Sequence, residues 1–136
     1  MKIITLEQRK LKKVIKEAIP DEPKILTSSL DNSIRLWDVK EMNQVSVMEA
    51  PEHSEISCMT FLINCGLVAT GHEDGVVRLW NTEINSSVIL KCKDNYKHTN
   101  TISCIEAIYK DSEFLLCGSY DGRVSIWEIT EKRSTA

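Results

Sequence analysis

The pattern of apolar and polar residues repeats three times along the chain, in residues 25–39, 68–82 and 115–129. Each segment begins with an apolar stretch, passes through an Asp-Asn or Asp-Gly pair, and continues with apolar residues at every other position. Alternation with a period of two is typical of β-strands, and these dipeptides suit tight turns that need a positive φ. Each segment therefore predicts a β-hairpin.

A tryptophan and an aspartate hold the same place in all three hairpins. With the tryptophans superposed, the copies read ILTSSLDNSIRLWDV, VATGHEDGVVRLWNT and LLCGSYDGRVSIWEI. The tryptophans lie 43 and 47 residues apart, and each follows the aspartate of its turn by six residues. An internal period of this length indicates a repeat architecture in which neighbouring units cover each other. The repeated residues are Trp37, Trp80 and Trp127, with Asp31, Asp74 and Asp121.

Two further strands are expected in each interval between hairpins, at 44–48 and 56–62 and then at 88–92 and 102–108. This makes four strands per repeat. In this arrangement the chain resembles the WD-repeat family, and the resemblance covers about residues 24–130. It implies an all-β fold, an incomplete β-propeller of WD-type four-stranded blades, with a short N-terminal helix.

The resemblance also implies a buried hydrogen-bond network in each blade. Its members are a histidine in the loop before the blade, a Ser or Thr on the second strand, the turn aspartate and the third-strand tryptophan. An indole N–H, a hydroxyl and an imidazole that are shielded from water each need a partner. The second repeat matches all four positions, with His53, Thr70, Asp74 and Trp80.

The other two repeats depart from this set. The third has a thiol where the hydroxyl belongs, and we expect a weaker network there because a thiol is a weak donor and acceptor. The first has no upstream histidine, because residues 1–20 do not resemble an opening strand and loop, so we expect an incomplete or unusual first blade. The third set is His98, Cys117, Asp121 and Trp127, and the first is Thr27, Asp31 and Trp37.

Residues beside the turns are candidates for contact with a partner. In the family, the residue before the turn aspartate faces the rim of the central channel, and these positions are Leu30, Glu73 and Tyr120. Tyr120 is the strongest of them, because an aromatic ring with a polar tip gives both contact area and orientation. Arg78 is a further candidate. His72 is expected to be an exposed turn residue.

A hydrolase is the sharpest alternative, because His53, Asp74 and Thr70 are the residue types of a nucleophile with its base and orienting acid. Two observations count against it: the constellation recurs with each hairpin, and in one copy the nucleophile position is a cysteine. The chain also has no GxSxG, phosphate-binding glycine-rich or HExxH motif. We therefore expect no catalysis and no cofactor.

Charge and cysteine usage narrow the class of protein. Residues 1–20 hold six Lys or Arg against two Glu, while the whole chain carries a formal charge of -3, so the remainder is acidic and does not favour nucleic-acid binding. The five cysteines form no C-x-x-C pair, which predicts reduced, buried thiols rather than disulfides or a zinc site. No apolar run approaches the length of a signal-peptide core or a membrane span, so an intracellular soluble protein is expected.

The basic N-terminal segment, residues 1–22, is treated as separate from the blades at 23–130 and the tail at 131–136. Within it, residues 6–19 place Leu11, Val14 and Ile15 at helical spacing, with lysines mainly elsewhere on the wheel. A basic amphipathic helix could dock on a partner, pack on the propeller's own edge or form a poorly ordered arm. Residues 2–6 could instead form a short strand.

Propellers close with typically four to eight blades, and two good blades with part of a third cannot close a ring. Either the chain is part of a longer protein or another polypeptide covers its open faces. We therefore expect a protein-interaction scaffold in the cytoplasm, with a peptide-recognition adaptor as the alternative. The strings GHEDGVVRLWN and GSYDGRVSIWEI are similar to blades of WD-repeat proteins of the ciliary axoneme, which points to a structural role there.

Overall fold

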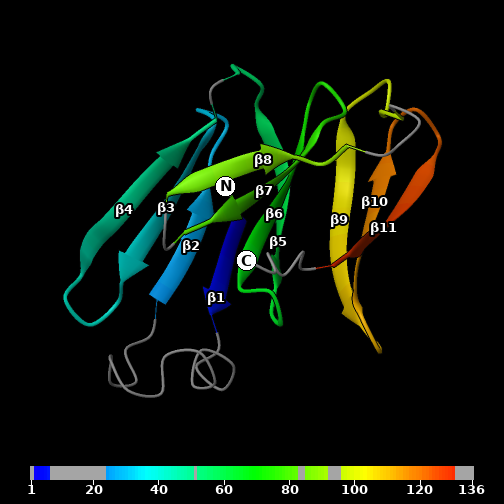
Figure 1. Ribbon diagram of the computed structural model, residues 1–136. Helices are drawn as coiled ribbons and strands as arrows, with labels where there is room; N and C mark the ends of the chain where they lie inside the picture. The colour runs from blue at the N-terminus through cyan, green and yellow to red at the C-terminus, as the bar shows by residue number, and fades with distance from the viewer. Residues whose placement is uncertain (1, 7–23, 51, 83–84, 92–95, 131–136) are drawn as a thin grey trace, which may run out of the picture.

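Three antiparallel sheets stand side by side in the computed structural model (Figure 1). It describes residues 2–6, 24–50, 52–82, 85–91 and 96–130, with only the backbone of 2–6. The first sheet contains β1 (Lys2–Leu6), β2 (Lys24–Ser28), β3 (Ser33–Asp38) and β4 (Asn43–Glu49), in that order. The second contains β5 (Ile56–Leu62), β6 (Leu67–His72), β7 (Val77–Asn81) and β8 (Ser86–Ile89). The third contains β9 (Ile102–Tyr109), β10 (Glu113–Ser119) and β11 (Val124–Ile129).

The predicted hairpins are β2–β3, β6–β7 and β10–β11, and each turns at the residue after the repeated aspartate. That residue has a positive φ in every copy, with values of 68°, 82° and 80° at Asn32, Gly75 and Gly122. Glycine adopts this conformation without steric cost, and asparagine tolerates it. Asn32 also donates from its amide to the carbonyl oxygens of Ala50 and Glu52, at 3.1 and 2.7 Å.

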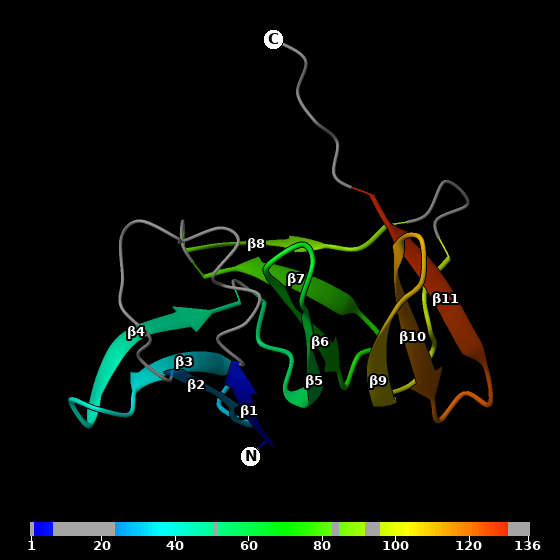
Figure 2. The ribbon, with the colours of Figure 1, turned by 90° about the horizontal axis from the view of Figure 1, so that it is seen from below.

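Apolar side chains between the sheets form two cores. The core between the first and second sheets includes Leu26, Ile34, Met59 and Trp80. The core between the second and third includes Leu62, Leu79, Ile102 and Leu115. Burying each of these side chains contributes roughly 1.5–3 kcal/mol, so the contacts between sheets hold the three together. Figure 2 shows the sheets arranged like sectors of an unclosed ring.

The first blade differs from the prediction. β1 pairs antiparallel with β2 from Lys2↔Ser28 to Leu6↔Lys24 and supplies the opening strand that residues 1–20 were expected to lack. The alternative prediction, a short strand at residues 2–6, is confirmed. The first sheet is therefore complete with four strands, and the third is the short one, because β11 has no further strand beside it among the described residues. The predicted helix at 6–19 lies outside the described residues except for Leu6, which ends β1.

The cysteines also differ in part from the prediction. The four described ones are free thiols, as expected, and Cys58 and Cys117 are buried. Cys65 is half-buried, and Cys104 is exposed on β9. Cys92 lies outside the described residues. Within the described part of the chain there is no helix long and apolar enough to cross a membrane.

Candidate functional site

A chain of hydrogen bonds runs through the buried side of the second blade. The Trp80 indole N–H donates to Thr70 Oγ1 at 2.8 Å, and Thr70 Oγ1 lies 2.8 Å from His72 Nε2. His72 Nδ1 lies 2.8 Å from the carbonyl oxygen of Ser54. Because a carbonyl only accepts, Nδ1 carries the ring proton and Nε2 accepts the hydroxyl proton of Thr70. The Trp80 indole, the Thr70 hydroxyl and the His72 imidazole therefore each have a partner.

His72 takes the place that the sequence had given to His53. It is 1% exposed, so the prediction of an exposed turn residue was wrong, whereas His53 is exposed. The reason is the strand period: Thr70 and His72 are two residues apart on β6 and point to the same side. Burial lowers the pKa of His72 and keeps the ring neutral. Asp74 accepts a hydrogen bond from the backbone N–H of Val76 at 3.1 Å and shapes the turn.

The third blade builds its network on Ser125 rather than on Cys117. The Trp127 indole N–H donates to Ser125 Oγ at 3.0 Å, and His98 Nε2 lies 2.8 Å from the same oxygen. His98 Nδ1 lies 2.9 Å from Asp121 Oδ2. The expectation of a network that depends on a weak thiol is therefore wrong, because a hydroxyl from the neighbouring strand replaces the thiol.

Two pKa values follow from this arrangement. Desolvation raises the pKa of the Cys117 thiol to about 12, so it stays protonated. For Asp121, desolvation acts upward, but hydrogen bonds from the Thr99 N–H, His98 and the Arg123 N–H outweigh it and lower the pKa to about 2. The Asp121 carboxylate is thus ionised and accepts the His98 Nδ1 proton.

Strand register explains why the hydroxyl changes strands. Thr70 lies directly opposite Arg78, and Cys117 lies directly opposite Ser125. In the first blade Thr27 lies opposite Arg35, and the Trp37 indole N–H donates to Thr27 Oγ1 at 2.9 Å. A hydroxyl thus occurs once in each cross-strand pair. The sequence signal for Ser125 was its place two residues before Trp127, on the same face of β11.

The first blade has no histidine in its network, and its aspartate bonds locally instead. Asp31 Oδ1 accepts from the backbone N–H and the hydroxyl of Ser33, at 3.0 and 2.6 Å. Asp31 Oδ2 pairs with the Arg35 guanidinium at 3.2 Å. The hydrogen bond from the Ser33 side chain is the main cause that lowers the pKa of Asp31.

Three of the four predicted contact residues are exposed, and the fourth is not. Leu30, Glu73 and Tyr120 lie on the surface beside their turns. Glu73 and Tyr120 border the same loop, because Thr101 donates from its hydroxyl to the Glu73 carbonyl and accepts from the Tyr120 N–H. Their role in binding stays a prediction.

Arg78 is 4% exposed and is therefore not a rim contact. Its guanidinium lies 5.9 Å from the centre of the Trp80 ring and pairs with Glu52. It also donates to Ser87 Oγ at 3.2 Å. Arg78 thus lies buried over the Trp80 ring, which is a structural role.

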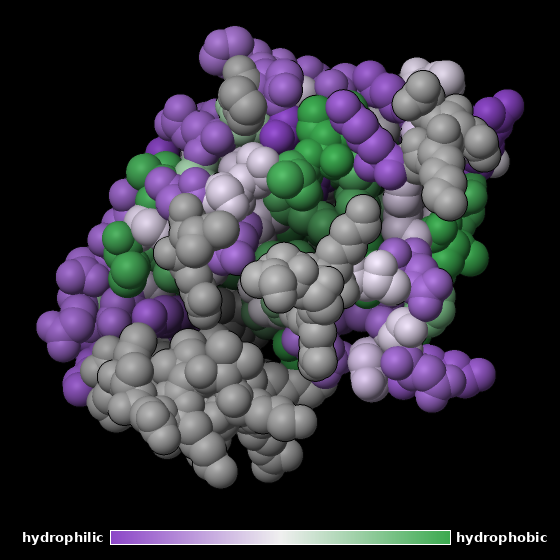
Figure 3. Space-filling model, in the orientation of Figure 1, coloured by the Kyte–Doolittle hydropathy of each residue, from purple (hydrophilic) through white to green (hydrophobic). Residues whose placement is uncertain are grey.

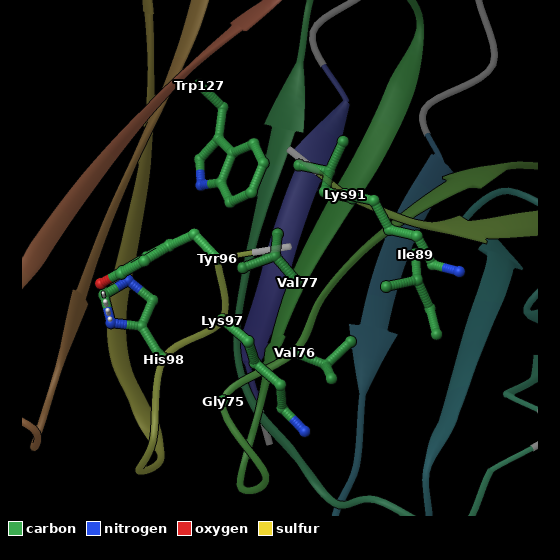
Figure 4. Close-up of a pocket in the computed structure, with 10 residues that line it drawn as sticks. Gly75, Val76, Val77, Ile89, Lys91, Tyr96, Lys97, His98 and Trp127 are labelled. Atoms are coloured by element: carbon green, nitrogen blue, oxygen red, sulfur yellow. Dashed lines mark hydrogen bonds between the residues drawn. The ribbon is translucent and has the colours of Figure 1, made fainter. Parts of the chain in front are cut away.

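A pocket of about 280 Å³ lies between the second and third blades (Figure 4). The Trp127 indole stands on the third-blade side, with Val77 and Ile89 across from it. The remaining lining residues are Gly75, Val76, Leu90, Lys91, Tyr96, Lys97 and His98.

The model of the WD domain, G-beta repeat, matches residues 17–38, 43–81 and 90–128. The chain belongs to the WD40-repeat family. Its WD40 relatives include Mitochondrial division protein 1 of Candida glabrata, with 32% identity over 74% of this chain and 14% of the relative. A guanine nucleotide-binding protein subunit beta of Solanum tuberosum is 29% identical over 85% of this chain and 31% of its own length. The Ribosome biogenesis protein WDR12 homolog of Dictyostelium discoideum is 27% identical over 79% of this chain and 23% of its own length.

Solved structures agree with the WD40 fold. The structure of U3-55K superposes with a TM-score of 0.64 at 21% identity and covers 78% of this chain and 32% of that protein. The computationally designed Ika4 protein superposes with a TM-score of 0.61 at 21% identity, and the match covers 82% of this chain and 63% of that protein. The chain spans less than a third of the length of the three curated WD40 relatives.

Ser125, His98 and Asp121 have the distances of a catalytic triad, but the WD40 network uses them otherwise. Ser125 Oγ accepts the indole N–H of Trp127, which draws electron density away from the oxygen. The same indole-to-hydroxyl bond recurs at Trp80 and Trp37, so it belongs to the repeat. Ser125 is also absent from the lining of the pocket beside Trp127. No group of three or more His, Cys, Asp or Glu within the described ranges could hold a metal ion.

Proposed function

We propose that this chain is a non-catalytic WD40-repeat scaffold that binds other proteins through the open face of its third blade. That face consists of the outward-pointing residues of the third sheet, which share rows across β9, β10 and β11. Its apolar residues are Cys104, Ile108, Phe114, Leu116, Val124 and Ile126, and Glu106 and Glu128 lie in the same rows.

One comparison within the chain carries this proposal. Val124 and Ile126 are 70% and 67% exposed, whereas Val77 and Leu79, at the same places in the second blade, are 3% and 7% exposed. Val77 and Leu79 are buried against the third blade. The open face therefore has the composition of a surface that another blade covers, and burying it stabilises the contact at roughly 25 cal/mol per Å² of apolar area.

The opposite end of the stack is also open, and its chemistry is different. Trp37 is half-buried in the first blade, whereas Trp80, its repeat counterpart, is 1% exposed beneath the first sheet. One end thus offers a tryptophan-bearing face and the other an aliphatic face. Contacts between these unlike faces join the three blades already, and further contacts of this kind extend or close a ring.

The apolar surface at the right-hand edge of Figure 3 lies where Figure 1 places β11. Exposed apolar patches of this kind mark protein interaction sites. The WD40 relatives agree with a role beside other proteins, since one of them is named as a subunit of a guanine nucleotide-binding protein. The partner proposed for the open face is a further β-sheet blade, from another polypeptide or from more of the same one.

Affinity purification of the tagged chain from its source cells, followed by mass spectrometry, tests the proposal. The Ile126→Lys variant should lose partners that the unchanged chain retains, because a charge on the open face opposes its burial. Val88→Lys is the matched control, because Val88 is an exposed β-branched residue on β8, outside the open face. Equal partner recovery with both variants would contradict the proposal.

A second candidate function is recognition of a peptide at the rim, and it rests on Tyr120, which is 74% exposed beside Glu73 and its loop. Tyr120→Ala and Glu73→Gln distinguish the two functions. An adaptor loses one defined ligand with these variants and keeps it with Ile126→Lys, whereas a scaffold shows the reverse.

The location proposed for this scaffold is the cytoplasm, within a large assembly such as the ciliary axoneme. The basis is the likeness of the second and third hairpins to axonemal WD-repeat proteins. Fluorescence microscopy of the tagged protein in ciliated cells tests it, and exclusion from cilia would remove the axonemal part.

A further inference from the structure

In the described part of the chain, the third blade has no counterpart of the groups that cover Trp80 in the second blade, and the pocket lies beside Trp127 at this place. Arg78 lies over the Trp80 ring, whereas the residue at the equivalent place in the third blade is the short Ser125. Ser87 on β8 lies opposite Trp80, whereas no described strand flanks Trp127 on its outer side. Trp80 is consequently buried, and Trp127 stays half-buried.

The pocket has an apolar wall. Val77, Ile89 and Leu90 come from the second blade and meet the Trp127 indole from the third. Such a wall, with few polar groups around it, is typical of sites that hold an apolar side chain of a ligand. A volume of about 280 Å³ is at the small end of ligand pockets, which suits a short stretch of peptide better than a large cofactor.

Among the described residues that line the pocket, the charges are of one sign. Lys91 and Lys97 line it and are exposed, and no Asp or Glu is among these described lining residues. In the described part of the chain neither lysine has an ion-pair partner. The nearby Asp121 carboxylate already accepts from His98 and from two backbone N–H groups. The unmatched charges therefore favour an anion.

A cation over the Trp127 ring would copy Arg78 over Trp80, so it is the competing occupant. Arg78 is neutralised there by the Glu52 carboxylate. A cation beside Trp127 would meet Lys91 and Lys97 instead, and like charges oppose its binding.

We propose that this pocket binds a segment of a partner protein in which a carboxylate side chain stands next to an apolar side chain. The apolar side chain packs against Trp127, Val77 and Ile89, and the carboxylate pairs with Lys91 and Lys97. The site lies on the other side of the third blade from the open face, so it is separate from the scaffold contact proposed above.

The test uses the full 136-residue chain with ¹⁵N-labelled tryptophan, and three acetylated, amidated tripeptides: Leu-Glu-Leu, Leu-Gln-Leu and Leu-Lys-Leu. The Trp127 indole N–H signal, assigned by its loss in Trp127→Phe, reports on the pocket. We expect Leu-Glu-Leu to shift this signal saturably and to bind roughly threefold to tenfold more tightly than Leu-Gln-Leu at low salt. The difference should shrink as salt is added.

Two lysine variants identify the charges. Lys91→Gln and Lys97→Gln should each reduce the preference for Leu-Glu-Leu over Leu-Gln-Leu, whereas Lys110→Gln, in the exposed β9–β10 turn, should leave it unchanged. Ile126→Lys should also leave peptide binding intact, so failure of this site and failure of the scaffold contact are distinguishable. Equal affinities for all three peptides, tighter binding of Leu-Lys-Leu, or no shift at millimolar peptide would each overturn the proposal.

Discussion

In each blade, one hydroxyl group accepts the hydrogen bond of the tryptophan indole N–H. Ser125 accepts the Trp127 indole N–H and contacts His98, while Cys117 opposite has a proton that its raised pKa keeps in place. The second blade achieves the same with Thr70 on the other strand of its hairpin. A blade thus needs one hydroxyl in this cross-strand pair, and either strand can supply it.

Ser125→Ala should destabilise the protein by about 1–2 kcal/mol, because the Trp127 N–H and His98 Nε2 lose their shared partner. Urea unfolding followed by tryptophan fluorescence measures this. Adding Cys117→Thr should recover part of the loss, since it restores the hydroxyl at the position that Thr70 holds in the second blade. Ser86→Ala, an exposed serine on β8, is the control and should be neutral. A neutral Ser125→Ala would mean that the network contributes nothing.

His72 should make stability depend on pH. Its pKa in the folded protein lies below the unfolded value of about 6.5, so the unfolded chain binds the extra proton first. Its contribution is complete above about pH 6.5 and is lost as the pH falls towards the folded pKa, at no more than about 1.4 kcal/mol per pH unit. Urea unfolding of His72→Gln between pH 7 and 5 should show a smaller slope than the unchanged chain. His53→Gln should keep the full slope, and a shared slope for all three proteins would exclude His72.

The hydrogen-bond networks of the blades were predictable from the sequence only in part. The pairs of Thr70 with Trp80 and Thr27 with Trp37 were predictable, because the family pattern and the strand period agree on them. The sequence did not reveal the role of His72, because the predicted hairpin placed His72 in the turn, whereas β6 extends to this residue. Deciding between His53 and His72 requires knowing that β6 extends to His72, because the strand period then places its imidazole on the same buried side as Thr70.

At the level of the elements, each turn closes its hairpin, and the turn at Gly75 also packs against the loop of the next blade. Gly75 and Gly122 have nearly the same φ, at 82° and 80°. A Cβ at Gly75 would overlap the carbonyl oxygen of His98, whereas a Cβ at Gly122 would meet nothing within 4 Å. The two turns therefore separate the cost of a left-handed backbone from the cost of close packing.

Gly122→Ala should destabilise the protein by about 1 kcal/mol through the positive φ alone. Gly75→Ala should cost about 1–3 kcal/mol more, because the loop that carries His98 must also move. Thermal unfolding of both variants beside the unchanged chain measures the difference. Equal destabilisation by the two variants would show that the loop that carries His98 can move away from the second turn at little cost in stability.

β1 shows the limit of reading elements from this sequence. Its five residues, KIITL, are β-branched at three positions but too short to give a clear alternation. The sequence therefore predicts a strand at residues 2–6 only as an alternative, because the seventeen residues between β1 and β2 have a basic helical pattern. The hairpins were found because tryptophan and aspartate recur, whereas β1 is recognised only by its pairing with β2.

For the whole molecule, the repeat allows the exposure of equivalent positions to be compared between blades. The same positions are buried in the second blade and exposed in the third, and this difference is the basis of the contact proposed for the open face. In a repeat protein each unit contacts only its neighbours, so no pattern within one blade encodes the total number of blades. The sequence therefore predicts the number of repeats in this chain, but it does not predict how a ring would be closed.

A paired substitution tests this view of the stack. Leu79→Ala should cost about 2–5 kcal/mol, because Leu79 is buried against the third blade and its loss leaves a cavity. Ile126→Ala, at the same repeat position on the open face, should change stability by less than about 0.5 kcal/mol in dilute protein. Urea unfolding at micromolar concentration measures both. A large cost at Ile126 in the isolated chain would mean that something already covers the open face, and raising the protein concentration would then show whether a second copy does so.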